Sequence, residues 1–254
     1  SGITMDARRL PEPPASGRSP LASPAAPLAS ASRGDPILRF YSWAPATLSL
    51  GYFQDYEDRR LHQASAELDV VRRSTGGGAI VHDRELTYSF VTPISRRLSA
   101  DHQQLVRAFH ETLCHSLANW QISANLFRLT PSDPPQNRQL SKKSFLCFQR
   151  REIDDVVSNA AKIAGSAQRR QRNALLQHGS VLLAKSLHAP ELLGIGDFAE
   201  HLPNADSLID DWTGKIATRL GANLVQGEVT NRERLSAEDH KKRRYGAPKW
   251  KNRR

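Results

Sequence analysis

Cysteine and long apolar runs are both scarce in this chain of 254 residues. The two cysteines, Cys114 and Cys147, are too few for a disulfide framework or for a thiolate zinc site, and they suit a reducing cytosol. We therefore expect a cytoplasmic protein without a metal. No apolar run approaches the roughly 18 residues of a spanning helix, which excludes an integral membrane protein.

Acidic residues are missing from the last 14 positions, Lys241–Arg254, which hold eight Lys or Arg. The other 240 residues carry a net charge of only +2, so the basic character of the chain belongs to this tail. Such a tail can attract an acidic partner or nucleic acid, but a solvated chain end explains the charge more simply. We expect neither nucleic acid nor a membrane as a partner.

The first 36 residues hold seven of the 15 prolines and show no apolar periodicity. Most of this segment is expected to be disordered, because it cannot bury enough surface to offset the entropy of ordering. A single catalytic domain is expected over residues 37–250, with the basic end continuing to 254.

Residue patterns in this domain predict an α+β fold, with a mixed, largely antiparallel sheet flanked by helices. A hairpin is predicted across Asp83-Arg84-Glu85. The predicted strands are Ile37–Trp43, Thr47–Phe53, Leu68–Ser74, Ala79–Asp83, Leu86–Pro93, Ala124–Thr130, Ser144–Gln149, Ile153–Val157, Ala161–Ala167 and Ala174–Leu183. The predicted helices are Asp55–Leu68, a helix from Ser99 or Asp101 to Trp120, Asp206–Leu220, and a last short helix that opens at Ser236-Ala-Glu-Asp239.

The segment Arg72-Arg73-Ser74-Thr75-Gly76-Gly77-Gly78-Ala79 lies between two predicted strands. Three consecutive glycines let the backbone approach a ligand closely and present amides to it. A plain turn would explain the glycines alone. The two arginines before them and His82-Asp83 after them favour a binding site. The segment is neither a Walker A loop nor a dinucleotide fingerprint.

Two further segments carry reactive side chains. Lys162 begins an apolar strand with Gly165 and Ala167, and it could either polarise a carbonyl from within a pocket or lie on the surface. Cys147 lies among aromatic residues and could be an inert buried thiol, or a nucleophile if a cation such as Lys162 lies near it.

Histidines present similar alternatives. His178, in Gln177-His178-Gly179-Ser180, could transfer a proton or form a structural hydrogen bond. His110 and Cys114 share a helix face and are interpreted as structural. Arg96-Arg97 and Arg169-Arg170 could contact a carrier protein, although solvated strand and loop ends explain them more simply.

These segments together resemble the family of lipoate–protein ligases and octanoyl transferases. The resemblance rests on Arg72-Arg73-x-Thr75-Gly-Gly-Gly-Ala79, His82-Asp83, Lys162-x-x-Gly165-x-Ala167 and Gln177-His178-Gly179-Ser180. Arg84–Ser89, Cys147-Phe148 and Arg244-Tyr245-Gly246-Ala247-Pro248-x-Trp250 look more like the cysteine-dependent octanoyl transferases. The resemblance runs from about Leu38 to Trp250.

This resemblance implies a biotin-protein-ligase-like catalytic domain and acyl transfer in protein lipoylation. Cys147 would take an octanoyl or lipoyl group from an acyl carrier protein. A lysine of a lipoyl-domain protein, such as glycine cleavage H protein or a 2-oxoacid dehydrogenase E2, would then accept it. Lys162 would polarise the acyl carbonyl and keep Cys147 ionised. The residues expected to bind the acyl group are Arg73, Thr75, Gly76, Gly77, Gly78, Ala79, His82, Gly165, Ala167, His178 and Gly179.

Two alternatives remain open. An ATP-dependent lipoate–protein ligase would form a lipoyl adenylate with ATP and magnesium, whereas the transferase needs no cofactor. A non-catalytic acyl-binding protein is the second alternative. It is suggested by three prolines in Ser19–Ser30, where the family usually has a helix, because an interior proline costs a helix about 3 kcal/mol.

Overall fold

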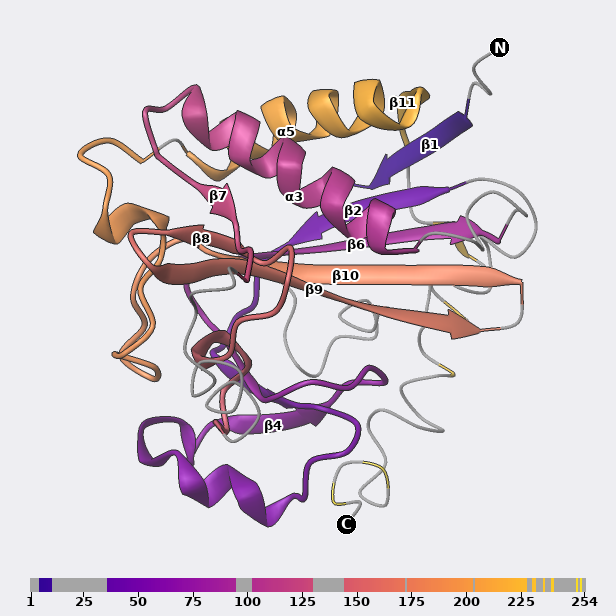
Figure 1. The fold of residues 1–254 in the computed structure, drawn as a ribbon. Coiled ribbons are helices and arrows are strands. Elements are labelled where there is room, and N and C mark those ends of the chain that lie inside the picture. The colour runs from indigo at the N-terminus through magenta and orange to yellow at the C-terminus, as the bar shows by residue number, and fades with distance from the viewer. Residues whose placement is uncertain are drawn as a thin grey trace.

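The computed structural model describes the backbone of residues 5–10, residues 36–94, 102–129, 144–171, 173–202 and 204–227, and positions 230, 231, 235, 239, 250 and 252. Two sheets organise these residues (Figure 1). The strands of the large sheet, in spatial order, are β11 (Ala222–Gln226), β1 (Met5–Leu10), β2 (Ile37–Tyr41), β6 (Glu85–Pro93), β10 (Ala174–Leu182), β9 (Ala161–Gln171), β8 (Val156–Ser158) and β7 (Asn125–Leu126). The small sheet consists of β4 (Asp69–Arg72), β3 (Thr47–Leu50) and β5 (Ile80–His82).

The large sheet is mixed, as the sequence predicts. β1 pairs in parallel with both of its neighbours, whereas the pairs from β2 to β7 are antiparallel. Helices α3 (His102–Ala118) and α5 (Ala205–Leu220) cover one face of this sheet, and the small sheet lies on the other side (Figure 1). Short 3₁₀ helices occur at η2 (Glu57–Leu61), η3 (Gln63–Ser65), η4 (Cys147–Gln149) and η5 (Ile195–Asp197). The α+β fold is therefore confirmed.

Helix α3 forms because apolar residues recur at every fourth position along it. This stripe, Leu105, Phe109, Leu113 and Leu117, is buried against the sheet and α5. Aromatic side chains fill the centre of this core: Phe40, Tyr88, Phe90, Phe109 and Trp212. The indole N–H of Trp212 donates to the carbonyl of Phe109 at 3.1 Å, which joins the two helices.

Both ends of α5 are capped. The Asn204 side chain accepts from the amide of Ser207 at 2.7 Å, and Gly221 takes the left-handed conformation with φ 64°. The predicted helix over Asp206–Leu220, with Gly221 after its end, is thus confirmed.

Strand β1 departs from the expectation of disorder for most of residues 1–36. Met5–Leu10 pairs through its backbone with β11 on one side and β2 on the other. Backbone hydrogen bonds need no apolar periodicity, so composition gave no signal for this strand. Residues 11–35, which include the proline-rich Ser19–Ser30, lie outside the described residues.

Two predictions fail between β3 and β6. Asp55–Leu68 forms the 3₁₀ segments η2 and η3 rather than an α-helix, and of its side chains only Ser65 is buried within them. A helix this exposed has little packing to stabilise it. The predicted hairpin across Asp83-Arg84-Glu85 is also wrong, because β5 pairs with β3 in the small sheet and β6 pairs with β2 and β10 in the large one.

The predicted strand over Ser144–Gln149 is also wrong, since only Leu146 forms an isolated bridge, with Ala79, before η4 begins. β7 is shorter than predicted, and β8 lies at the end of its predicted range and one residue beyond. Residues 131–143 and most of the last predicted helix lie outside the described residues.

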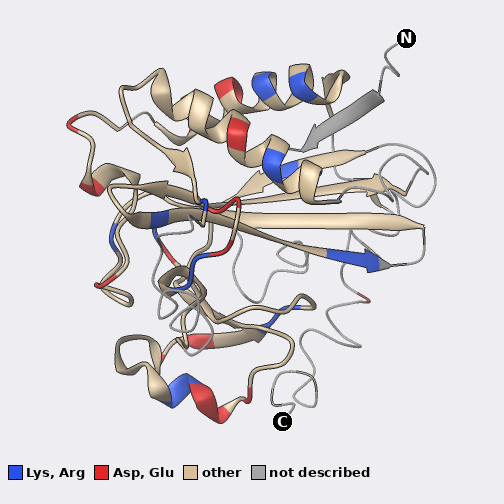
Figure 2. Ribbon diagram, viewed as in Figure 1, with Lys and Arg blue, Asp and Glu red and all other residues tan. Residues whose placement is uncertain are grey.

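Acidic and basic residues are interspersed along both helices and in the small-sheet region (Figure 2). Among the described residues, the helices are too short or too polar to cross a membrane.

Candidate active site

The glycine segment and the cysteine segment are held together by their backbones. The amide of Ala79 donates to the carbonyl of Phe145 at 2.8 Å, and the amide of Cys147 donates to the carbonyl of Ala79 at 2.7 Å. A Cβ added at Gly78 would lie 2.8 Å from the carbonyl oxygen of Phe145 and 2.9 Å from the amide of Cys147. Only glycine permits this approach, which places Cys147 beside the loop.

Arg73 supports the inside of the glycine loop. Its guanidinium donates to the carbonyls of Gly76 at 2.9 Å and Gly78 at 2.5 Å, and to the carbonyl of Ser49 in β3 at 2.9 Å. Burial lowers the pKa of Arg73 to about 10, a change that the nearby Cys147 opposes. Arg73 is therefore still a cation at neutral pH, it lies near the thiol, and it shapes the loop.

The glycine loop also contacts the large sheet. Thr75 Oγ1 lies 2.8 Å from Nε2 of His178 in β10, and the Arg169 side chain of β9 donates to the carbonyl of Ser74 at 2.6 Å. Burial, followed by the charges of Arg73 and His82, lowers the pKa of His178 to about 3. His178 is thus a neutral hydrogen-bonding group, and Arg169 is a structural contact rather than a solvated strand end.

Lys162, at the start of β9, is buried and paired. Its Nζ lies 2.7 Å from Oδ2 of Asp155 and 5.4 Å from the ring centre of Phe148, which follows Cys147. Burial alone would lower the pKa of Lys162, but the charges of Cys147 and Asp155 outweigh it and hold that pKa above its usual value. Lys162 is therefore a fixed ammonium near the thiol.

Gly165, three residues further along β9, makes room for this ion pair. A Cβ at Gly165 would lie 2.6 Å from Cε of Lys162, 2.9 Å from its Nζ and 3.1 Å from Oδ1 of Asp155. In β10, His178 lies opposite Ala167 and Gly179 lies opposite Ser166. The Lys162–Ala167 and Gln177–Gly179 motifs are thus neighbours in the sheet.

His82 lies at the end of β5 within a buried polar group. Its ring stacks on Trp43 at 4.2 Å between centroids, and its Nδ1 lies 2.9 Å from Oε1 of Glu85. The Trp43 indole N–H donates to the hydroxyl of Thr87, and that hydroxyl donates to the Glu85 carboxylate. These contacts hold His82 in place between the two sheets.

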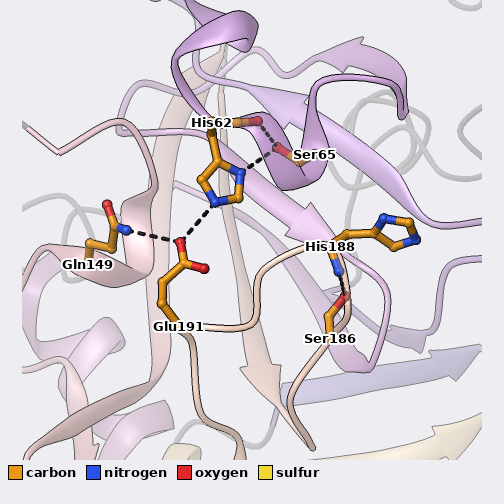
Figure 3. A network of polar contacts seen from close by, with 6 residues as sticks. All are labelled: His62, Ser65, Gln149, Ser186, His188 and Glu191. Atoms are coloured by element: carbon orange, nitrogen blue, oxygen red, sulfur yellow. Dashed lines mark hydrogen bonds and ion pairs between the residues drawn. The ribbon is translucent and has the colours of Figure 1, made fainter.

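A second network of polar contacts includes Gln149, the last residue of η4 (Figure 3). Glu191 Oε1 lies 2.9 Å from Nε2 of His62 and accepts from the Gln149 side chain at 3.0 Å, while His62 Nδ1 lies 2.8 Å from Ser65 Oγ. Ser, His and Glu also form hydrolase triads, but Ser65 is fully buried and faces Nδ1 rather than Nε2. The network instead anchors the segment that begins with Cys147.

The structure brings the predicted site residues into one region. Cys147, Lys162, Arg73 and the glycine loop are linked by direct contacts or mutual electrostatics, and His178 joins them through Thr75. Asp155, the partner of Lys162, was missed because the sequence assigns it to the predicted strand Ile153–Val157. A buried lysine requires an anionic partner, which is the signal that could have pointed to it.

Cys114 and His110, both in α3, keep the structural interpretation that the sequence gave them. Burial raises the pKa of Cys114 to about 11, so its thiol is unreactive near neutral pH. His110 is buried and hydrogen bonded at both ring nitrogens. In the parts of the chain that the structure describes, His, Cys, Asp and Glu form no group of three or more suited to a metal ion.

Comparison with known proteins places this site in a family. Residues 22–208 match the lipoyl protein ligase A/B catalytic domain, and the chain belongs to that family. An octanoyltransferase LipM of Brevibacillus brevis is 31% identical over 257 residues, covering 89% of this chain and 91% of that protein. A LipM of Kyrpidia tusciae is 33% identical over 253 residues, covering 86% and 88%.

Solved structures show the same fold. The crystal structure of a lipoate-protein ligase A bound with ATP superposes with a TM-score of 0.77 over 98% of this chain and 99% of that one, at 23% identity. The resemblance to lipoate–protein ligases and octanoyl transferases inferred from the motifs is therefore confirmed, and so is the catalytic-domain fold it implied.

Proposed function

We propose that this chain is an octanoyl transferase of protein lipoylation that carries the acyl group on Cys147. Membership in the family and similarity to several LipM octanoyltransferases support the transfer. The observation that carries the role of Cys147 is its position, with its amide bonded to the glycine segment and its thiol near the cations of Lys162 and Arg73.

In the first step, the Cys147 sulfur attacks the carbonyl carbon of a donor thioester. A carbon–sulfur bond forms to Cys147, the bond to the donor sulfur breaks, and the donor leaves as a thiolate. The Lys162 ammonium stabilises the negative charge that develops on the carbonyl oxygen, and it favours the thiolate form of the nucleophile.

In the second step, the amine of an acceptor lysine attacks the same carbonyl carbon. A carbon–nitrogen bond forms, the bond to Cys147 breaks, and the proton that the amine loses returns to the departing Cys147 sulfur. Amide formation from a thioester is downhill, so the reaction needs neither ATP nor a metal. An acyl carrier protein is the proposed donor, and a lipoyl-domain protein such as glycine cleavage H protein or an E2 subunit is the proposed acceptor.

The residues around this centre have proposed binding roles. The Gly76–Gly78 segment and Ala79 line the site of the acyl group. Arg73 and Thr75 hold this loop in place through their hydrogen bonds. Gly165, Ala167 and Gly179 keep the facing strands free of bulky side chains, and His82 and His178 border the site as buried rings.

The ATP-dependent ligase is the competing function, favoured by the similarity of fold to the ATP-bound ligase. In that reaction Lys162 would bind the phosphate of an adenylate, with magnesium at the nucleotide, and Cys147 would be dispensable. A transferase works without ATP and requires Cys147, so the two functions make opposite predictions.

Intact mass spectrometry distinguishes them. Purified protein mixed with octanoyl carrier protein, without ATP, should gain one octanoyl group that hydroxylamine removes. Cys147→Ala should gain none, and Cys114→Ala is the matched control that should acylate as the wild type does. Acylation of Cys147→Ala at an unchanged rate would refute the thioester, and acyl transfer that depends on ATP would support the ligase. A protein that binds the donor without any transfer would be the non-catalytic alternative.

A further inference from the structure

A chain of hydrogen-bonded side chains starts at α3 and crosses β9, β10 and β6. His110 Nδ1 lies 2.5 Å from the main-chain oxygen of Asp154, and its Nε2 lies 2.6 Å from Ser166 Oγ. Ser166 Oγ lies 2.6 Å from the hydroxyl of Tyr88, which accepts from the Gln177 side chain at 2.9 Å. None of these side chains has a role in the acyl transfer proposed above.

The chemistry of the partners fixes the position of each proton in this chain. A carbonyl oxygen only accepts, so His110 Nδ1 carries a hydrogen. Burial lowers the pKa of His110 to about 4, so the ring is neutral and its Nε2 must accept from the Ser166 hydroxyl. Ser166 has one hydrogen, and the hydroxyl of Tyr88 therefore donates to it. His110 is held as a single tautomer.

The His110 end of this hydrogen-bonded series lies beside Asp155, the partner of Lys162. The oxygen of Asp154 and the amide nitrogen of Asp155 belong to one peptide plane. His110 bonds that oxygen, and the carbonyl of Glu152 accepts from the Asp155 amide at 3.0 Å. Asp154 has φ 74°, a left-handed conformation that most side chains disfavour, so the turn needs contacts that hold it.

Other contacts hold the same turn from outside. Arg107 and Arg128 both bond the Asp154 carboxylate, and the amide of Phe127 donates to the carbonyl of Asp155 at 2.7 Å. The contact from His110 is the buried side-chain contact to the peptide that leads into Asp155, and the Glu152 amide donates to Asp155 Oδ2 at 2.6 Å. The Asp155 carboxylate then meets Lys162 Nζ at 2.7 Å.

We propose that His110 is a positioning residue for Lys162. By holding the Asp154–Asp155 peptide through Nδ1, it fixes the carboxylate that sets the place of the ammonium beside Cys147. This inference rests on the proposed role of Lys162 in acyl transfer. On this proposal, the contact from His110 Nδ1 to Asp154 is essential for the position of Lys162, and the contact from Nε2 to Ser166 is secondary.

Two substitutions separate the two ring nitrogens. In His110→Asn an amide N–H can take the place of Nδ1 and still donate to Asp154, whereas His110→Gln places its amide near Nε2 and loses that bond. The rate constant of Cys147 acylation at saturating octanoyl carrier protein should fall about 10- to 100-fold in His110→Gln and stay within about threefold of wild type in His110→Asn. The half-saturating donor concentration should change little in either variant, because His110 does not touch the donor.

Parallel measurements on Lys162→Ala distinguish the possible failures. If Lys162→Ala acylates like the wild type, the proposed role of Lys162 is wrong, and the inference fails with it. If Lys162→Ala is inactive while His110→Gln and His110→Asn behave alike, whether both active or both inactive, only the inference about His110 is overturned.

A measurement on the unmodified protein does not depend on how the variants fold. Protein with ¹⁵N-labelled histidine is examined by two-bond ¹H–¹⁵N correlation between pH 5 and 8, and the His110 imidazole should be neutral and protonated at Nδ1. The His110 signal is assigned by its absence from the spectrum of either His110 variant. If these variants do not fold, it is assigned by its contact to α3 protons. A His110 signal protonated at Nε2, or at both nitrogens, would overturn the proposal.

Discussion

Lys162 Nζ and Asp155 Oδ2 lie 2.7 Å apart, both buried, in a pair whose positive end lies near the Cys147 thiol. A buried ammonium without a carboxylate would be too costly to keep charged. The pair therefore lets the fold maintain a cation in an otherwise enclosed site. Its catalytic value depends on the ammonium staying where the carboxylate places it.

Replacing Lys162 with Met, which keeps most of its volume, should reduce Cys147 acylation at least about 100-fold, because the charge that stabilises the oxyanion is lost. The rate of Cys147 alkylation, measured against pH by iodoacetamide, should also reach half its maximum at a higher pH than in the wild type. Lys215→Met, which removes a partly exposed lysine of α5 that pairs with Asp211, is the control and should change neither quantity. An unchanged alkylation profile would limit Lys162 to the acyl carbonyl.

Gly165→Ala tests the room that the ion pair needs. The added methyl would overlap Cε and Nζ of Lys162, which can swing away because they are the end of a flexible side chain. We expect a loss of acylation of about 10- to 100-fold with a change in unfolding free energy of only about 1 kcal/mol.

Gly214→Ala is the matched control for that substitution, since a Cβ at Gly214 in α5 meets nothing within 4 Å. It should leave acylation unchanged and stabilise the protein by about 0.5–1 kcal/mol, as replacement of a mid-helix glycine usually does. Equal activity of Gly165→Ala and wild type would mean that the position of Lys162 is not critical.

Helices α3 and α5 and the site motifs could be predicted from the sequence because their signals are local. Apolar spacing defines α3 and α5, and the glycine, lysine and histidine motifs are short runs of unusual composition. What could not be predicted depends on pairing between distant segments. The turn at Asp83-Arg84 looks like a hairpin, yet it carries the chain from one sheet to the other.

The same limit applies inside the site. Phe145-Leu146-Cys147-Phe148 has the composition of a strand, but its one bridge, at Leu146, leads into a 3₁₀ turn. Asp155 and His110 gained their roles only when the turn at Asp154 met α3. Sequence motifs therefore identified the reactive groups, and tertiary contacts identified the residues that hold them.

The basic tail offers a test of donor steering. Trp250 donates its indole N–H to the carbonyl of Arg72 at 3.0 Å and packs near Tyr52, so residues 251–254 follow directly from a contact with the glycine segment. Deleting 251–254 removes three positive charges. For an acidic carrier protein, KM should rise roughly two- to fivefold with kcat unchanged, and its dependence on salt should flatten. Equal KM and equal salt dependence would identify the tail as a solvated end.

Two buried histidines should make the protein less stable in mild acid. The pKa of His110 is lowered to about 4 and that of His178 to about 3, mainly by burial, whereas an unfolded histidine titrates near 6.5. The unfolded chain therefore takes up protons that the folded chain does not. The stabilisation is complete above about pH 6.5 and is lost as the pH falls toward the folded values, at about 1.4 kcal/mol per pH unit for each histidine.

Urea unfolding at pH 7.5 and pH 5.0 measures this effect. His178→Gln keeps a hydrogen-bonding group near Thr75 but cannot be protonated, so its loss of stability between the two pH values should be about 2 kcal/mol smaller than that of the wild type. His115→Gln, an exposed position on α3, should lose as much as the wild type. If His178→Gln instead loses as much stability as the wild type, His178 must take up its proton without unfolding, and the ring could then act as a proton carrier beside the glycine loop rather than as a fixed neutral group.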